Sequence, residues 1–231
     1  MKAAILVPVK EHARAKSRMA PLLTAEERSA LAWAMFEDLI EALSPLPWPV
    51  VLVTNSRRAS ARAGSLGWTV VREEIQLSES ASVDAGSQRL AQEGMQAVLR
   101  LPADLPLIQT EDVAELLSLP ISAPAAILVP SWDRSGTNAL LRTPPDLFPS
   151  RFGPDSFALH VRAAAEAGAD LRIVENARLA LDLDDPSDLS RFLASCADNQ
   201  THRTLMGFNI LERLANYAAQ RDPHLGFAQN S

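Results

Sequence analysis

Short apolar runs and amphipathic segments alternate along the first half of the chain. The runs are rich in Val, Ile and Leu, which is typical of strands buried on both faces of a sheet. Between them, apolar residues recur every three or four positions, as on one face of a helix. This pattern predicts strands and helices in turn: strands at 3–9, 50–53, 68–71, 97–101 and 125–129, and helices at 24–43, 57–66, 80–96 and 110–117. Because a β-α-β order implies right-handed crossovers, we predict an α/β fold with a mostly parallel sheet and helices on both faces.

The second half continues the pattern less regularly. Further strands are expected at 139–141, 171–174 and 179–183. The Phe152–Phe157 segment is expected to start a helix that carries His160, and another helix is expected over 188–194, where Asp185 or Ser187 would act as the cap.

The character of the sequence changes near residue 196. Residues 199–202 resemble a linker, 205–219 can form an amphipathic helix, and 221–231 resemble a disordered tail. We therefore predict a domain over 1–195 and a C-terminal helix with a tail over 196–231. This helix is expected either to pack on the core or to form a contact in a homodimer.

A basic loop follows the first predicted strand. It contains Lys10, Arg14, Lys16 and Arg18. Open α/β sheets bind ligands beyond the carboxyl ends of their strands, so these cations are placed to bind a polyanion. The alternative is a solvated loop that binds nothing.

Two segments around the middle of the chain carry candidate polar groups. Ser80 and Ser82 begin a predicted helix, and one of them is expected to cap it. Asp104 lies between Pro102 and Pro106 at the end of a predicted strand, which favours a metal ligand, with a structural Asx-turn as the alternative.

Two later segments are expected to bind a small anion. The polar loop 131–138 lies between two apolar runs and ends in Thr137 and Asn138. Gly153 permits close approach of the backbone, and Ser156 lies at a helix N-terminus, where free amides favour an anion. A phosphate or a carboxylate would fit there.

Asp182 and Asp184 are expected on the same side of an extended strand. Like charges placed in this way repel each other unless a cation lies nearby. Together with Asp104, they form a candidate hard-oxygen site for Mg²⁺, which commonly takes one or two carboxylates plus substrate phosphates.

Composition limits the function classes. The 231 residues are 47% hydrophobic, enough for a full core, and the net charge of −6 disfavours general binding to nucleic acids. Cys196 is the single cysteine, so no internal disulfide or zinc cluster is expected, and no stretch is long and apolar enough to span a membrane. A cytoplasmic enzyme is the expectation.

Five motifs together resemble the 2-phospho-L-lactate guanylyltransferase family, also described as phosphoenolpyruvate or 3-phospho-D-glycerate guanylyltransferase of coenzyme F420 biosynthesis. The resemblance covers about residues 2–193. It rests on Pro8-Val9-Lys10 with Ala15-Lys16-Ser17-Arg18, Pro102-Ala103-Asp104-Leu105-Pro106, Gly136-Thr137-Asn138-Ala139-Leu140, Phe152-Gly153-Pro154-Asp155-Ser156-Phe157 with His160, and Asp182-Leu183-Asp184 with Asp188-Leu189.

The resemblance implies a Rossmann-like nucleotidyltransferase fold, similar to the nucleotide-diphospho-sugar transferases, and transfer of GMP from GTP to a phosphorylated three-carbon acid. It places Lys10, Lys16 and Arg18 at the GTP phosphates. It places Thr137, Asn138, Gly153 and Ser156 at the acid, and Asp104 with Asp182 or Asp184 at Mg²⁺. His160 is expected to be a packing or supporting residue.

One segment departs from the family. Relatives commonly have a Leu-Asn pair where this chain has 80–84, a region expected near the nucleotide, so Ser80 and Ser82 are candidate nucleotide contacts. Two other functions compete with guanylyl transfer: a metal-dependent glycosyltransferase that uses a nucleotide sugar, and a nucleotide-binding module without catalysis.

Overall fold

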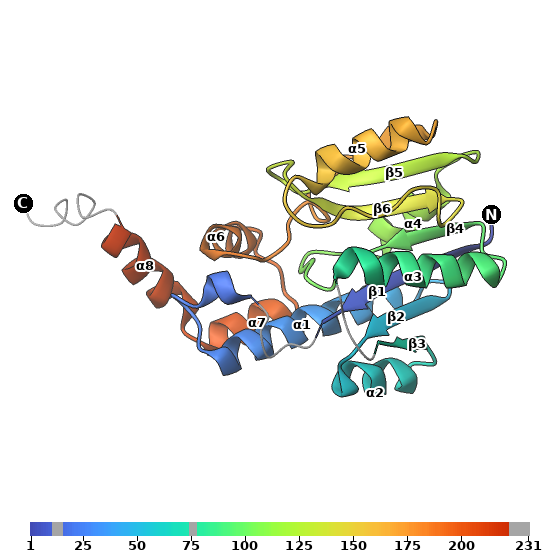
Figure 1. Ribbon diagram of the computed structural model, residues 1–231. Coiled ribbons are helices and arrows are strands. Elements are labelled where there is room, and N and C mark those ends of the chain that lie inside the picture. Colours follow the sequence, from blue (N-terminus) through green and yellow to red (C-terminus); the bar gives the residue numbers. More distant parts are fainter. Residues whose placement is uncertain (11–15, 74–77, 222–231) are drawn as a thin grey trace, which may run out of the picture.

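A computed structural model describes residues 1–10, 16–73 and 78–221. Within these ranges the elements, in chain order, are β1 (Ala3–Val9), a 3₁₀ helix (Ser17–Met19), α1 (Ala25–Leu43), β2 (Val50–Thr54), α2 (Arg57–Ser65), β3 (Thr69–Arg72), α3 (Glu79–Gln92), β4 (Ala97–Arg100), α4 (Thr110–Ser118), β5 (Ala125–Pro130), β6 (Thr137–Thr143), α5 (Ser156–Glu166), β7 (Asp170–Ile173), α6 (Pro186–Ala194), α7 (Gln200–Gly207) and α8 (Ile210–Arg221) (Figure 1). Arg14 and the tail 222–231 lie outside the described residues.

The strands form one seven-stranded sheet in the order β3-β2-β1-β4-β6-β5-β7. The pairs β1–β2, β1–β4, β2–β3 and β5–β7 are parallel, whereas β6 is antiparallel to both β4 and β5. The predicted mostly parallel α/β sheet is therefore confirmed. The strand order reverses between β1 and β4, which is where open α/β sheets bind their ligands.

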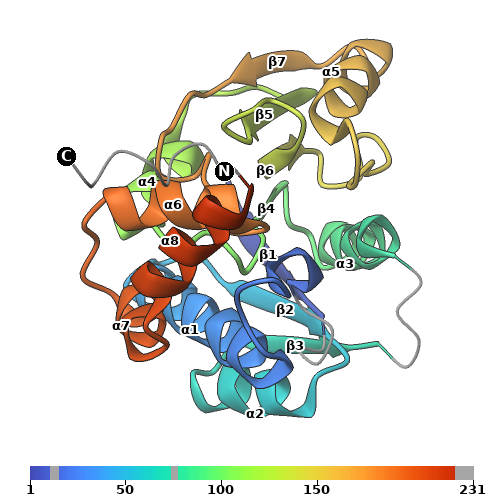
Figure 2. The same cartoon turned by 90° about the vertical axis from the view of Figure 1, so that its left-hand side faces the viewer.

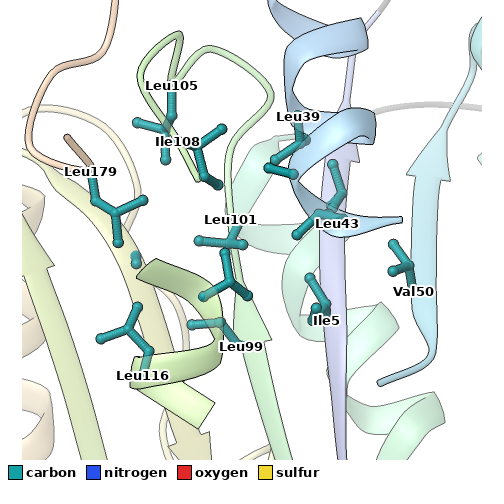
Figure 3. Close-up of a cluster of buried hydrophobic side chains, with 14 of the residues drawn as sticks. Ile5, Leu39, Leu43, Val50, Leu99, Leu101, Leu105, Ile108, Leu116 and Leu179 are labelled. Carbon is teal, nitrogen blue, oxygen red and sulfur yellow. The ribbon is translucent and has the colours of Figure 1, made fainter. Parts of the chain in front are cut away.

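Alternation along β1 explains why helices cover both faces. Its odd-numbered residues, such as Ile5, face one core with Leu39 and Leu43 of α1 and with residues of α2 and α4. Figure 3 shows this core from β1 to Leu116 of α4. The even-numbered residues, such as Leu6, pack against α3 on the opposite face. Farther along that face α5 lies on β5 and β6 (Figure 1).

The ends of α1 follow from its sequence. Thr24 and Glu27 form the capping box, in which each side chain accepts a hydrogen bond from the other residue's amide. The prolines at 45, 47 and 49 lie directly beyond its end, where they oppose continuation of the helix.

Three local predictions were wrong. The cap of α3 is Ser78, whose hydroxyl accepts from the amide of Ala81, and neither Ser80 nor Ser82 takes this role. Residues 199–202 are not a linker, because Asn199 caps α7. The single helix expected over 205–219 is divided, since α7 ends at Gly207 and α8 begins at Ile210.

The strand predicted at 179–183 is also wrong, although Leu179, Leu181 and Leu183 are all buried as the alternation implied. The segment makes no strand pairing. Instead, the side-chain amide of Asn138 donates to the carbonyls of Leu179 and Ala180, both at 3.0 Å. The amide of Trp132 also donates to the carbonyl of Ala180 at 2.9 Å, and the amide of Leu183 donates to the carbonyl of Asp104. The apolar alternation predicted burial correctly but could not reveal that isolated hydrogen bonds from the Asn138 side chain and from loop backbone replace a strand pairing here.

The helix α7 lies against α1, and α8 continues from α7 (Figure 2). Leu205 of α7 and Ile210 of α8 are fully buried in one apolar cluster with Leu31 of α1 and Phe192 of α6. Of the two alternatives for this region, packing on the core is therefore observed for α7. The division of the chain at residue 195 and a homodimer stay predictions.

Candidate active site

A cleft of about 1120 Å³ opens beyond the carboxyl ends of β1 and β4 and beside the β5–β6 loop. Segments far apart in the sequence supply its walls. They include ten of the twelve predicted site residues: Lys10, Lys16, Arg18, Asp104, Thr137, Asn138, Gly153, Ser156, Asp182 and Asp184.

Ser80 and Ser82 are the two that do not line the cleft. The hydroxyl of Ser80 accepts from the amide of Phe152 at 2.9 Å, and the buried Ser82 donates to the carbonyl of Ser78 at 2.9 Å. In this structure both hydroxyls support the backbone of neighbouring segments. A nucleotide contact for either residue stays a prediction.

Lys16 occupies the centre of the acidic side of the cleft. Its Nζ lies 2.7 Å from Oδ2 of Asp104 and 2.7 Å from Oδ1 of Asp184, and its side chain is 7% exposed. Burial alone would lower the pKa of Lys16, but the two carboxylates outweigh burial and raise it above its ordinary value. Burial alone would raise the pKa of Asp104, and the Lys16 ammonium instead holds it below its ordinary value. Lys16 and Asp104 are therefore both charged near neutral pH.

Asp182 is a third carboxylate at the same place. Burial, together with the charges of Asp104 and Asp184, raises its pKa to about 7. The Asn138 amide donates to its Oδ1 at 3.1 Å. Near pH 7 Asp182 is therefore divided between its protonated and its ionised form.

These carboxylate oxygens fit the chemistry of a hard divalent cation. Within the described ranges, however, no three acidic, His or Cys side chains stand together so that they could hold a metal unaided. A Mg²⁺ ion at this place would need further oxygen ligands, such as those of substrate phosphates.

The fold places these aspartates through buried polar contacts. The carboxylate of Asp188 accepts from the amides of Asp184 and Asp185, both at 2.9 Å, while Asp185 caps α6 as predicted. The amide of Leu183 donates to the carbonyl of Asp104 at 3.2 Å. These bonds hold the turn after β4 next to the turn before α6.

Hydroxyl groups line the opposite side of the cleft. The Ser156 Oγ accepts from the amide of Thr137 at 2.9 Å, and the Thr137 Oγ1 lies 2.9 Å from Nδ1 of His160. Thr137 and Ser156 are 5% and 2% exposed, so each presents only a small surface to the cleft.

The N-terminus of α5 offers fewer free amides to an anion than the sequence predicted. The Ser156 amide donates to the carbonyl of Gly153 at 3.2 Å, so it is already used within the turn. Gly153 has a φ of +124°, which favours glycine, and a β-carbon there would meet no described atom within 4 Å. Glycine is therefore required by the backbone conformation and not by crowding within the protein.

Sequence reasoning missed Arg100, a buried cation in the cleft wall. Its guanidinium donates to the carbonyl of Thr137 at 3.2 Å, pairs with Glu79 and lies 4.0 Å from the ring centroid of Phe152. The sequence did contain a signal for Arg100, because it is the one charged residue within the otherwise apolar run 97–101.

Trp132 was also missed. It is 44% exposed at the cleft, its indole N–H donates to Asp188 at 3.1 Å, and Arg191 lies 3.6 Å above its ring. A tryptophan within the polar loop 131–138 was the signal.

Comparison with solved structures shows the same fold class. A crystal structure from Desulfovibrio desulfuricans G20, provisionally named a nucleotide-diphospho-sugar transferase, aligns with a TM-score of 0.77 over 94% of this chain and 98% of that chain, at 16% identity. A nucleotidyl transferase from Methanothermobacter aligns with a TM-score of 0.60 over 84% and 96%, at 18% identity. The predicted nucleotidyltransferase-like fold is confirmed.

Comparison with protein families and curated relatives is more specific. Residues 3–216 match the family described as guanylyl transferase CofC like. A phosphoenolpyruvate guanylyltransferase from Rubrobacter xylanophilus is 41% identical over 82% of this chain and 93% of its own length. A 3-phospho-D-glycerate guanylyltransferase from Colwellia psychrerythraea is 32% identical over 82% and 90%. The predicted family resemblance is thereby confirmed, and this chain belongs to the CofC-like guanylyltransferases, a family of nucleotidyltransferases.

Proposed function

We propose that this protein transfers GMP from GTP to a phosphorylated three-carbon acid and releases pyrophosphate, in coenzyme F420 biosynthesis. The candidate acids are phosphoenolpyruvate, 2-phospho-L-lactate and 3-phospho-D-glycerate, which are the acids in the names of the relatives. Phosphoenolpyruvate is the acid we expect, because the relative with 41% identity carries that name.

The observation that carries the proposal is the arrangement of the cleft in two halves. Lys10, Lys16 and Arg18 line it from the segment that follows β1, whereas Thr137 begins β6 and Ser156 begins α5, and β4 lies between β1 and β6 in the sheet. The carboxylates lie between them: Asp104 and Asp184 contact Lys16, and Asp182 accepts from Asn138, the neighbour of Thr137. Such a cleft suits two anionic substrates that must be brought together.

The transfer reaction needs little from the protein beyond holding the two anionic substrates together. An oxygen of the acid's phosphate attacks the α-phosphorus of GTP, a new P–O–P bond forms, and the bond from the α-phosphorus to the β-phosphate oxygen breaks to release pyrophosphate. Holding both anions in line supplies most of the rate enhancement. We assign Lys10, Lys16 and Arg18 to the triphosphate, where their charges stabilise the departing pyrophosphate.

Asp104, with Asp182 or Asp184, is the set we assign to Mg²⁺. When bound, Mg²⁺ would polarise the phosphates that it contacts and reduce the repulsion between the two substrates. The Lys16 ammonium forms ion pairs with Asp104 and Asp184 in this structure. The ammonium and the divalent cation would therefore share these carboxylates.

The acid is assigned to the hydroxyl side. Its phosphate must face the nucleotide, so its carboxylate is left to meet Thr137, Ser156 and the backbone near Gly153. Asn138 is assigned to this side as well, although its amide is also bonded to Leu179, Ala180 and Asp182.

The test is pyrophosphate release by purified protein with Mg²⁺, using each of the four NTPs in combination with each of the three acids. We expect release only when GTP and one acid are both present. Binding of GTP without release under any combination would indicate a nucleotide-binding module. Cleavage of a nucleotide sugar without activity toward GTP would indicate a glycosyltransferase.

A further inference from the structure

His160 of α5 is a buried histidine with two directed hydrogen bonds. It is 0% exposed, and its ring meets Phe152 edge-on at a centroid distance of 4.9 Å. Its Nε2 lies 2.8 Å from the amide nitrogen of Arg151, and its Nδ1 lies 2.9 Å from Oγ1 of Thr137.

These two contacts determine where the ring proton sits. The backbone N–H of Arg151 can only donate, so Nε2 of His160 must accept and carries no proton. A neutral imidazole has one N–H, and in this site that N–H is on Nδ1, which donates to the Thr137 oxygen. Burial, with the nearby cations Arg100, Arg142 and Arg151, lowers the pKa of His160 to about 3, so the ring stays neutral at physiological pH.

The direction of this bond determines what Thr137 can offer a ligand. Its hydroxyl oxygen accepts from His160, so its own hydrogen is available for donation, and no acceptor for it is present among the described residues. Ser156 is in the same situation, because its oxygen accepts from the Thr137 amide. Both residues line the cleft, so the hydrogen of each hydroxyl can be donated to a ligand bound there.

We propose that His160 is a positioning residue, which fixes the Thr137 hydroxyl as a hydrogen-bond donor toward the carboxylate of the acid substrate. The identity of the acid in this proposal rests on the proposed function. The position of the proton on the His160 ring does not depend on that function. If Thr137 instead donated to Nδ1 of His160, its hydroxyl hydrogen would be used within the protein. Only lone pairs of the hydroxyl oxygen would then remain for the substrate, and these repel a carboxylate.

Nitrogen-15 NMR of the imidazole in the free protein tests the proton arrangement without any substrate. We expect a neutral ring with the proton on Nδ1 of His160 across neutral pH. A proton on Nε2, or a ring that is charged at neutral pH, would overturn the proposal.

A double-mutant cycle tests the consequence for the acid. We expect His160→Phe and Thr137→Val each to raise KM for the acid at least tenfold, with KM for GTP changed less than twofold. Their effects should not multiply, because both remove the same hydrogen bond to the substrate. His160→Gln should recover part of the loss, since its carboxamide can accept from Arg151 and donate to Thr137. Melting temperatures of all variants separate this effect from unfolding.

The outcomes are distinct. If wild-type protein is active and His160→Phe costs the same in the Thr137→Val background as in the wild type, His160 acts only as a packing residue and the proposal fails while the proposed function stands. If the wild-type protein neither binds nor converts any of the acids, the proposed function fails, and the role of His160 in acid binding fails as well.

Discussion

Lys16 holds a position that a metal ion would also favour. Its ammonium contacts the carboxylates of Asp104 and Asp184 at equal distances of 2.7 Å. Burial, together with the charges of these two carboxylates, raises the pKa of Asp182 to about 7. Removing one partner of a buried ion pair leaves the other uncompensated, which is costly. The residues at this site are therefore expected to respond strongly to any change in positive charge.

Replacing Lys16 by Met should make the protein depend on a divalent cation for stability. In EDTA we expect a lower melting temperature than that of the wild type, because Asp104 and Asp184 lose their internal cation. Added Mg²⁺ should raise the melting temperature of the variant more than that of the wild type. Lys10→Met is the matched control, because Lys10 is exposed. Equal Mg²⁺ shifts in Lys16→Met and the wild type would contradict the assignment of the carboxylates to a metal.

Asp104→Asn should remove most of the turnover while leaving the fold intact. The amide keeps the size of the carboxylate but loses its charge, and loss of one preorganised electrostatic group commonly costs about 10²–10³-fold in rate. Initial rates of pyrophosphate release would measure the loss, and circular dichroism would verify the fold. Asp155→Asn makes the same charge change at the cleft rim, where the side chain caps no amide, and should stay active. A fully active Asp104→Asn protein would show that Asp104 has no catalytic or metal-binding role.

At the scale of elements, the sequence allowed most strands and helices to be predicted, because burial on one or two faces leaves a periodic pattern. The sequence also placed Asp104, Asp182 and Asp184 in one candidate site, because like carboxylates on one side of an extended segment repel each other unless a cation lies nearby. Long-range hydrogen bonds left no such pattern. The segment 179–183 is held by the Asn138 side chain and by backbone bonds to Trp132 and Asp104 instead of by a strand. The proton arrangement of His160 follows only from its two partners.

Asp112 links α4 to the segment before Asp182. It is buried and accepts from the side chains of Asn176 at 2.7 Å and Arg178 at 2.8 Å. Burial alone would raise the pKa of Asp112, but the hydrogen bonds from Arg178 and Asn176 outweigh burial and hold it below the ordinary value. A carboxylate with a lowered pKa stabilises the fold above the pKa of the unfolded chain, about 3.9, and this contribution is lost as the pH falls through the folded-state pKa.

Asp112→Asn should therefore lower the free energy of unfolding at pH 7 by roughly 1–3 kcal/mol, the cost of weakened hydrogen bonds at a buried group. The difference from the wild type should shrink as the pH falls below about 4, where the wild-type carboxylate also becomes protonated. Urea titrations at a series of pH values would measure it. A difference that does not change with pH would show that the Asp112 charge contributes nothing to stability.

At the scale of the whole molecule, the C-terminal helices are tied to the sheet domain by polar as well as apolar contacts. Asp38 of α1 is buried and accepts from the amides of Gln200 and Thr201, at 2.8 and 2.9 Å. Arg213 of α8 pairs with Glu27 at the start of α1 at 2.7 Å. Within residues 1–10, 16–73 and 78–221, no helix has both the length and the apolar character needed to cross a bilayer.

Asp38→Ala should loosen α7 and α8 from α1. Two helix N-terminal amides and the Thr201 hydroxyl lose their acceptor, which should cost roughly 1–3 kcal/mol in unfolding free energy. Hydrogen exchange should show faster exchange over 200–221 than in the wild type, with β1 and β4 unchanged. Glu41→Ala removes a neighbouring charge on the same helix and should leave exchange over 200–221 as it is. Unchanged exchange in Asp38→Ala would show that apolar packing alone holds these helices.

The identity of the product tests the central claim most directly. Mass spectrometry of a reaction with GTP, Mg²⁺ and phosphoenolpyruvate should show one new species whose mass equals the sum of the two substrates minus pyrophosphate, with none formed by Asp104→Asn. If GTP is converted only to GDP or GMP, or if no adduct forms with any of the three acids, the cleft does not join a guanylyl group to a phosphorylated acid.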